Sequence, residues 1–259
     1  STHNVTVKVT DNGQGKLVAD VKDNNPTFTN TYKATSTTAT ITATKVLEGK
    51  ALEADKYEFE LKKGEEVVAT AKNAADGTVT FKEIEYNEAG DHTYTISEKA
   101  GSEKGVTYDT AKHEVKVKVT DNGQGQLVST VTGNNPTFTN TYKATPAKAT
   151  ITATKVLDGK ALEADKYEFE LKEKESDKVV ATAKNAADGT VAFPAIEYTA
   201  TGTHTYTITE KAGNETGVTY DKNAYTVTVK VADNGQGQLV ATVTGNNPTI
   251  TNTYVAETP

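Results

Sequence analysis

A repeat of about 110 residues is the feature that most restricts how this chain can fold. The segment ATITATKVLEGKALEADKYEFELK begins at Ala39 and returns at Ala149 with a single substitution. NNPTFTNTY occurs at 24–32 and 134–142, and becomes NNPTITNTY at 246–254. A period this long exceeds that of a solenoid unit and is typical of whole domains arranged in tandem.

The repeats divide the chain into two complete units and one partial unit. Residues 36–143 and 146–254 are complete, whereas residues 1–33 match only 111–143, the last third of a unit. Residues 255–259 follow as a short tail. The links KATSTT and KATPAK are short and polar, so we expect the units to form a rod with limited freedom between neighbours.

Each complete unit is predicted to be a β-sandwich. Alternating apolar residues, separated by Asp-Gly and Asn-Gly turns, predict eight short strands in the first unit. They cover 39–47, 56–63, 66–72, 78–82, 92–98, 113–120, 126–132 and 137–142. This number of strands in a unit of this length is typical of an immunoglobulin-like, all-β sandwich.

Composition excludes several classes of function. The chain has no cysteine and therefore no disulfide, thiolate metal site or cysteine nucleophile. It has no arginine and a net charge of -7, which argues against nucleic-acid binding. No apolar run approaches the roughly 20 residues that span a bilayer, so no membrane insertion is expected. The DNGQG segments are interpreted as hairpin turns, and no metal or cofactor is predicted.

Three polar residues per unit lie in phase with the core. Lys45 shares the face of Ala39, Ile41 and Ala43 in ATITATKVL. Glu98 shares the face of Tyr94 and Ile96, and Asn140 that of Phe138 and Tyr142. The second unit repeats the pattern with Lys155, Glu210 and Asn252. Lone buried charges are costly, so this coincidence requires an explanation.

Three interpretations of each trio remain open. The side chains could reach solvent at strand ends, or form a buried Lys–Glu ion pair capped by an amide. Alternatively, burial lowers the lysine pKa and raises the glutamate pKa, leaving a neutral amine beside a protonated acid. Such an amine can attack the asparagine amide, expel ammonia and leave an isopeptide bond, with the acid moving the protons.

Several motifs resemble a known family in order along both units. TATKVLEGKAL, KNAADGTVTF, HTYTISEKAG, GVTYD, VKVTDNGQGQL and FTNTY are similar to the streptococcal pilin isopeptide-linkage repeat of T-antigen-type backbone pilins. The resemblance implies a CnaB-like, reverse-immunoglobulin sandwich. It also implies cross-links Lys45–Asn140 and Lys155–Asn252, with Glu98 and Glu210 as the assisting acids. Residues 1–33 depart from the pattern because Asn30 has neither partner in the same unit.

The function implied is structural. We expect a stalk or pilus-shaft segment of a Gram-positive surface protein, extracellular and anchored to the cell wall through a part outside this sequence. The alternative is an adhesin whose loops bind a host protein or glycan, but the loops of the two units are nearly as alike as the strands. A turnover enzyme is not expected, because each trio would be consumed in one self-reaction. The expected partners are adjacent repeats of the same chain, with host ligands bound by other domains.

Overall fold

The computed structural model describes residues 1–256, which fold into strands joined by turns. The prediction of an all-β fold is confirmed. Residues 1–256 contain no helix that is long and apolar enough to cross a membrane. Of the predicted tail at 255–259, residues 257–259 lie outside the described residues.

The strands fall into three groups along the chain. The first group is a hairpin of β1 (Thr6–Asp11) and β2 (Leu17–Lys22). The second group is β3 (Thr37–Ala39), β4 (Thr42–Glu48), β5 (Glu58–Lys63), β6 (Glu66–Lys72), β7 (Thr78–Thr80), β8 (Ile84–Tyr86), β9 (Gly90–Glu98), β10 (Val106–Thr107), β11 (Lys112–Asp121), β12 (Leu127–Thr132) and β13 (Thr137–Tyr142). The third group is β14 (Ala147–Ala149), β15 (Thr152–Asp158), β16 (Glu168–Glu173), β17 (Val179–Lys184), β18 (Thr190–Ala192), β19 (Ile196–Tyr198), β20 (Gly202–Glu210), β21 (Val218–Thr219), β22 (Tyr225–Asp233), β23 (Leu239–Thr244) and β24 (Thr249–Tyr254).

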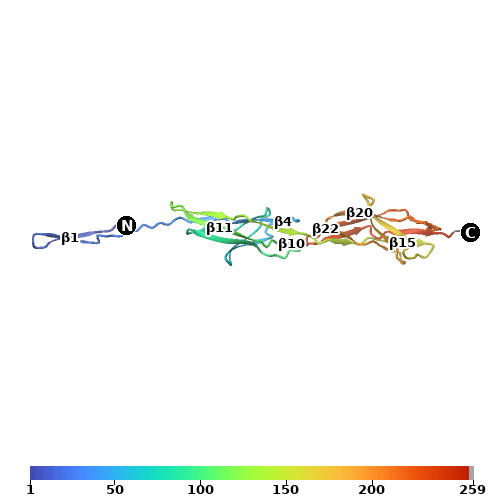
Figure 1. Ribbon diagram of the computed structural model, residues 1–259, viewed down its shortest axis with the longest axis horizontal. Coiled ribbons are helices and arrows are strands. Elements are labelled where there is room, and N and C mark those ends of the chain that lie inside the picture. The colour runs from blue at the N-terminus through green and yellow to red at the C-terminus, as the bar shows by residue number, and fades with distance from the viewer. Residues whose placement is uncertain (257–259) are drawn as a thin grey trace.

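Each of the two larger groups is a sandwich of two sheets. In the first sandwich, a sheet with strand order β10-β13-β4-β7 faces a sheet with order β12-β11-β9-β5-β6. The second sandwich repeats this with β21-β24-β15-β18 and β23-β22-β20-β16-β17. Short pairs, β3 with β8 and β14 with β19, complete each unit. Figure 1 shows the hairpin and the two sandwiches following one another along the long axis.

Side-chain alternation places one apolar core inside each sandwich. On β11, Val115, Val117 and Val119 are buried while the lysines between them are exposed. The two cores are built from matching residues, such as Phe59 and Phe169. The pleat therefore turns the sequence pattern into an interior and a surface, as the strand alternation predicted.

One strand pair sets the positions of the predicted cross-link residues. β4 runs parallel to β13, with Lys45 opposite Phe138 and Leu47 opposite Asn140. β15 and β24 pair in the same way, with Lys155 opposite Ile250. Lys45 and Asn140 thus lie on adjacent strands, two positions apart in register, on the face that covers the core.

The structure departs from the predicted strands at two places. The strand predicted at 39–47 is divided into β3 and β4, because the Asn134 side chain accepts the Thr42 N–H at 2.9 Å and donates to the Thr40 carbonyl. The chain passes from the β3–β8 pair to the main sheet at this break. The short strands β8 and β10 were not predicted, since two or three residues carry little alternation.

Candidate functional site

The three predicted residues of the first unit come from both sheets of the sandwich. Lys45 lies on β4 and Asn140 on the adjacent β13, while Glu98 is the last residue of β9 in the opposite sheet. Lys45 is 2% exposed and Asn140 is fully buried. The Glu98 side chain is 1% exposed. All three side chains therefore meet inside the core, away from water.

Glu98 contacts both of the other residues at once. Its Oε2 lies 2.7 Å from Lys45 Nζ, and its Oε1 accepts a hydrogen bond from Asn140 Nδ2 at 2.6 Å. One carboxyl group therefore bridges the amine and the amide. This arrangement places a group that can accept and donate protons between a nucleophile and its leaving group.

The second unit has the same geometry. Glu210 Oε2 lies 2.8 Å from Lys155 Nζ, and Glu210 Oε1 accepts from Asn252 Nδ2 at 2.7 Å. Lys155 is 2% exposed and Asn252 is fully buried. Two sites built from residues about 110 positions apart agree to within 0.1 Å in both contacts.

Burial shifts the pKa values of the two lysines and of Glu210 toward their neutral forms. Burial lowers the pKa of the Lys45 amine, and the nearby Glu98 offsets this only in part. The pKa of Lys155 is lowered for the same reason. Burial raises the pKa of the Glu210 carboxyl against the opposing effect of Lys155 and Asn252. A proton on the carboxyl and a neutral amine are the forms that nucleophilic attack requires.

The ring of a tyrosine forms one wall beside each lysine. Lys45 Nζ lies 4.9 Å from the ring centroid of Tyr57, and Lys155 Nζ lies 4.8 Å from that of Tyr167. Both tyrosines are buried. The aromatic faces exclude water and limit the directions in which the amine can move.

An aspartate that the pattern of the strands did not single out completes each site. The Asp109 backbone N–H donates to Asn140 Oδ1 at 2.7 Å, and the Asp221 N–H donates to Asn252 Oδ1 at 2.8 Å. Both residues close the GVTYD motif, which repeats at 105–109 and 217–221. The repetition of this motif was the only sign in the sequence that the aspartate matters. The contact itself uses a backbone N–H, which the alternation of side chains along a strand does not reveal.

The aspartate side chain fixes the strand that carries the asparagine. Asp109 Oδ2 accepts the Thr139 N–H at 2.8 Å, and Oδ1 accepts the Ala111 N–H. Burial alone would raise the pKa of the Asp109 carboxyl, but these two N–H groups and Lys45 hold it below its usual value. Asp109 is therefore an anion. Its carboxylate binds β13, and this holds Asn140 beside the backbone N–H of Asp109.

Asn30, the unpaired asparagine of the partial unit, is exposed and lies outside any strand. The structure brings Asn30 to neither a lysine nor a glutamate among residues 1–256. The six residues of the complete units are brought together, and Asn30 is not.

Comparison with known proteins gives a family match over nearly the whole chain. The model of the Spy0128-like isopeptide containing domain matches residues 1–33, 41–143 and 151–255. The three matched segments follow the three repeats seen in the sequence. No curated protein matches this chain significantly.

Solved structures with some likeness to this chain include two pilus proteins and repeats of a collagen binding protein. The major pilin T-13 of Streptococcus pyogenes is 18% identical, with 86% of this chain and 100% of that chain covered and a TM-score of 0.30. A C-terminal fragment of the pilus adhesin SpaC of Lactobacillus rhamnosus GG is 16% identical, with 85% and 100% covered and a TM-score of 0.29. Two B repeat units of the Staphylococcus aureus collagen binding protein are 22% identical, with 97% and 56% covered and a TM-score of 0.25.

Proposed function

Because the chain belongs to the family of Spy0128-like isopeptide-containing domains, we propose that its complete units are structural repeats of a stalk or pilus shaft. In this proposal each repeat is closed by one internal covalent bond, Lys45–Asn140 in the first and Lys155–Asn252 in the second. The chain stands on the outer surface of a Gram-positive cell, next to further repeats of its own kind. It performs no turnover, since each site reacts once.

The observation that carries the proposal is the carboxyl group shared by amine and amide. Glu98 lies 2.7 Å from Lys45 Nζ and accepts from Asn140 Nδ2 at 2.6 Å. An ion pair that only balanced two buried charges would not need the amide, and replacing such pairs by apolar residues is often neutral or stabilising. The same triad occurs twice, so the arrangement belongs to the repeat.

The first step is a proton transfer that activates the amine. The Lys45 ammonium gives a proton to Glu98, its partner at 2.7 Å, because burial disfavours the charged form of the amine. The neutral Nζ then attacks the side-chain carbonyl carbon of Asn140. Negative charge that develops on Asn140 Oδ1 is stabilised by the Asp109 N–H, which already donates to that oxygen at 2.7 Å.

The second step breaks the carbon–nitrogen bond of the amide. Glu98 donates its proton to the departing nitrogen and takes one from the attacking Lys45 nitrogen, so its own protonation is unchanged. Ammonia leaves, and the carbonyl carbon remains bonded to Lys45 Nζ. One amine and one primary amide have become one secondary amide and one ammonia.

The mechanical consequence follows from the strand pairing. The bond joins β4, near the start of the repeat, to the adjacent parallel strand β13 at its end. Tension along the chain therefore passes between two neighbouring strands without unfolding the residues between them. A repeat without the bond would release the residues from 45 to 140, at about 3.3–3.6 Å per residue when extended.

Intact-mass spectrometry of the whole chain tests the proposal. Each bond lowers the mass by about 17 Da, the mass of one ammonia, so we expect a loss equal to two ammonia molecules. Glu98→Ala should leave a loss of one, and Glu98→Ala with Glu210→Ala a loss of none. An unmodified mass in the unaltered chain would contradict the proposal.

A matched control is available in the same repeat. Glu103 also pairs with a lysine, Lys50, at 2.8 Å, but it contacts no asparagine. Glu103→Ala should therefore keep both mass losses. If Glu103→Ala and Glu98→Ala reduced the mass loss equally, the role assigned to Glu98 would be wrong.

A further inference from the structure

The surroundings of the two Lys–Glu–Asn sites differ in the segment that follows the shared GVTYD motif. The first repeat continues with TAKHE and the second with KNAYT. His113, on β11, lies opposite Ile96, and Tyr225, the first residue of β22, lies opposite Ile208. The two isoleucines hold the same place in HTYTISE and HTYTITE. Tyr225 therefore takes the position in the second sandwich that His113 has in the first.

In the second repeat, Tyr225 binds the aspartate that faces the amide of the site. The Tyr225 hydroxyl donates to Asp221 Oδ2 at 2.8 Å. The backbone N–H of Asp221 in turn donates to Asn252 Oδ1 at 2.8 Å. Only one residue therefore separates the tyrosine from the amide that the lysine would attack.

The Tyr225 hydroxyl connects the two sheets of the sandwich through Asp221. β22, which carries Tyr225, belongs to the five-stranded sheet, whereas β24, which carries Asn252, belongs to the four-stranded sheet. Asp221 Oδ2 also accepts the N–H of Thr251 on β24, at 3.3 Å. A hydroxyl contact of 2.8 Å is near the optimum, while 3.3 Å is beyond the usual range for an N–H, so Tyr225 is the stronger tether.

The first repeat holds its aspartate in a different way. Asp109 Oδ2 accepts the Thr139 N–H of β13 at 2.8 Å, the contact that is 3.3 Å long in the second repeat. The Nε2 atom of His113 is buried and has no hydrogen-bond partner within residues 1–256. The His113 ring packs edge-on against Phe138, with the ring centroids 4.9 Å apart. Among the residues that the structure describes, Asp109 therefore accepts hydrogen bonds from backbone groups alone.

The charge of Asp221 makes the tyrosine contact a strong one. Burial would raise the pKa of the Asp221 carboxyl, but hydrogen bonds from the Asn223 N–H and the Tyr225 hydroxyl bring it below its usual value. Burial and the neighbouring Asp221 raise the pKa of the Tyr225 hydroxyl, which therefore keeps its proton. A hydroxyl that donates to a carboxylate forms a charge-assisted hydrogen bond, roughly twice as strong as one between neutral groups.

We infer that Tyr225 is a positioning residue for the bond between Lys155 and Asn252. His113, at the same place in the first repeat, has no such role. Attack on Asn252 places negative charge on its Oδ1, which the Asp221 N–H stabilises only while it stays aligned with that oxygen. The Tyr225 hydroxyl keeps the aspartate, and with it this N–H, in place. The inference rests on the proposed function and adds that the two repeats form the same bond with different supports.

The rate at which each bond forms tests the inference. The full chain is synthesised in a short pulse, and samples are unfolded in acid at successive times, which stops the reaction. After digestion, mass spectrometry measures the fraction of each lysine that is joined to its asparagine. The Lys45–Asn140 bond in the same molecules is the internal standard. The temperature is set so that the unaltered chain is half joined midway through the series.

Tyr225→Phe keeps the ring and removes only the hydroxyl. Complete removal of an oxyanion donor slows a reaction by about 10²–10³-fold. In Tyr225→Phe the Asp221 N–H remains but is less well aligned, so the second bond should form about tenfold more slowly. The first bond should form at its unaltered rate.

Two matched variants separate this role from a general loss of stability. His113→Phe changes the equivalent position of the first repeat, where no hydroxyl contact is lost, so neither bond should form more slowly. Tyr198→Phe removes another buried hydroxyl of the second repeat, which lies 3.0 Å from the Tyr206 hydroxyl. This variant should leave the rate of the second bond unchanged.

The titration of Asp221 is a readout that a general change in stability does not move. Nuclear magnetic resonance of the labelled full chain follows the carboxyl carbon of Asp221 as the pH is varied. In Tyr225→Phe the pKa of Asp221 should be higher than in the unaltered chain, because a hydrogen bond that favours the anion has been removed. In Tyr198→Phe this pKa should be unchanged.

The outcomes distinguish this inference from the proposed function. Slower formation of the second bond alone, with a raised pKa of Asp221, supports the inference. Equal rates in Tyr225→Phe and the unaltered chain, or an equal slowing in Tyr198→Phe, would overturn it and leave the bonds themselves in place. An unaltered chain that never loses ammonia would overturn the proposed function, and this inference with it.

Discussion

The same nine residues, NNPTFTNTY, adopt two different structures in this molecule. At 134–142 the last six of them form β13, in which Phe138 and Asn140 are fully buried. At 24–32 they contain no strand, and Phe28 is 64% exposed. The difference is the neighbour: β13 lies beside β4, and among residues 1–256 the earlier copy has no such partner. The last strand of a unit therefore forms because it pairs with the first strand of the same unit. Its local sequence alone does not make it a strand.

A second pair of corresponding segments, similar but not identical in sequence, behaves in the opposite way. β1 and β2 pair from Thr6–Lys22 to Asp11–Leu17, in the register that β11 and β12 use from Lys116–Thr132 to Asp121–Leu127. The hairpin forms with or without a sandwich around it, because its turn and register are local. The comparison separates what the sequence specifies locally from what the whole repeat specifies.

The largest effect is expected from removing the first-strand lysine. Lys45→Ala should cost roughly 4–5 kcal/mol of unfolding free energy in the first repeat, by analogy with a disulfide that closes a loop of this length. Glu98 and Asn140 also lose their partner in the core, which adds to the loss. Calorimetry should show one transition at lower temperature and one unchanged, and protease should cut the first repeat first.

An exposed lysine provides the control for this substitution. Lys56 makes only a 3.9 Å contact with Glu53, and both side chains are largely in water. Lys56→Ala should change the unfolding free energy by less than about 0.5 kcal/mol. Equal melting of the Lys45→Ala chain and the unaltered chain would mean that the buried trio does not stabilise the repeat.

The two copies of NNPTFTNTY can be compared directly through their phenylalanines. Phe138→Ala removes a fully buried ring and should cost about 3–5 kcal/mol. Phe28→Ala, in the same local sequence, should change stability by less than about 0.5 kcal/mol. Denaturant unfolding followed by tyrosine fluorescence measures both. A similar cost at both positions would show that residues 24–32 are packed in solution.

Much of the fold could be predicted because the strands alternate strongly. The predicted strands 66–72 and 137–142 agree with β6 and β13 at both ends. The inward phase of Lys45 followed from Ala43 two residues before it, and the structure buries both. A period of two assigns a side chain to a face without knowledge of its neighbours.

Features that depend on long-range contacts could not be predicted. The break between β3 and β4 is made by Asn134, more than 90 residues away in sequence. The contact of the Asp109 N–H with Asn140 uses a backbone group, which has no residue-type signature. The Tyr142 contact with the DNGQG loop joins two repeats, and the loop alone indicates only a turn.

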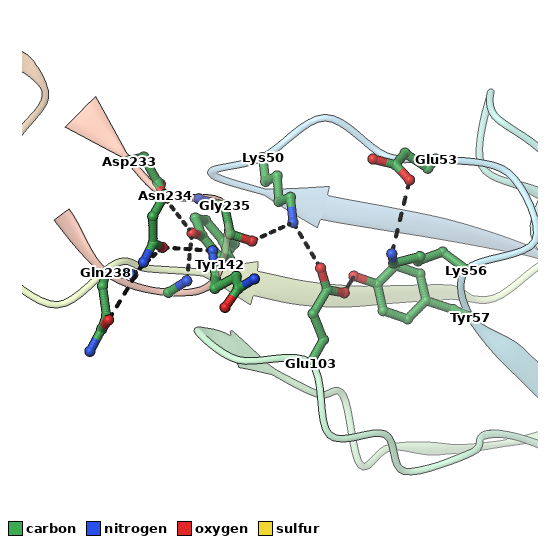
Figure 2. A network of polar contacts seen from close by, with 12 residues as sticks. Lys50, Glu53, Lys56, Tyr57, Glu103, Tyr142, Asp233, Asn234, Gly235 and Gln238 are labelled. Atoms are coloured by element: carbon green, nitrogen blue, oxygen red, sulfur yellow. Dashed lines mark hydrogen bonds and ion pairs between the residues drawn. The ribbon is translucent and has the colours of Figure 1, made fainter. Parts of the chain in front are cut away.

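A smaller comparison is between the two junctions of the chain, where a tyrosine of one repeat contacts the DNGQG loop of the next. The Tyr32 hydroxyl donates to Asp121 and accepts the Gly125 N–H. The Tyr142 hydroxyl makes the same two hydrogen bonds with Asp233 and Gly237 (Figure 2). Tyr32, however, is 62% exposed. Tyr142→Phe removes two hydrogen bonds from a buried position, which should cost about 1–3 kcal/mol of docking free energy. Tyr32→Phe should cost less, since water replaces its partners.

Relaxation measurements on the two sandwiches can detect this loss. In the unaltered chain both should tumble with one common rotational correlation time. In Tyr142→Phe the two values should separate as the junction loosens, with no change in the melting of either repeat. Equal loosening by Tyr32→Phe would show that burial of Tyr142 adds nothing to the junction.

Acid should loosen the junction between the two sandwiches at Tyr142, because it protonates the Glu103 carboxylate. This is the smallest effect expected. Burial raises the pKa of the Glu103 carboxyl, but the hydrogen bonds from Lys50 and Tyr57, with the charges of Lys50 and Lys56, bring it below its ordinary value of 4.5. A depressed carboxylate pKa contributes stability that is present above 4.5 and is lost as pH falls through the lower, folded-state value. Protonated Glu103 no longer holds Lys50 over Tyr142 (Figure 2), so the correlation times of the two sandwiches should begin to separate below that pH. In Glu103→Gln they should already differ at neutral pH and change little on acidification, whereas a pH response equal to that of the unaltered chain would assign the effect to another carboxylate.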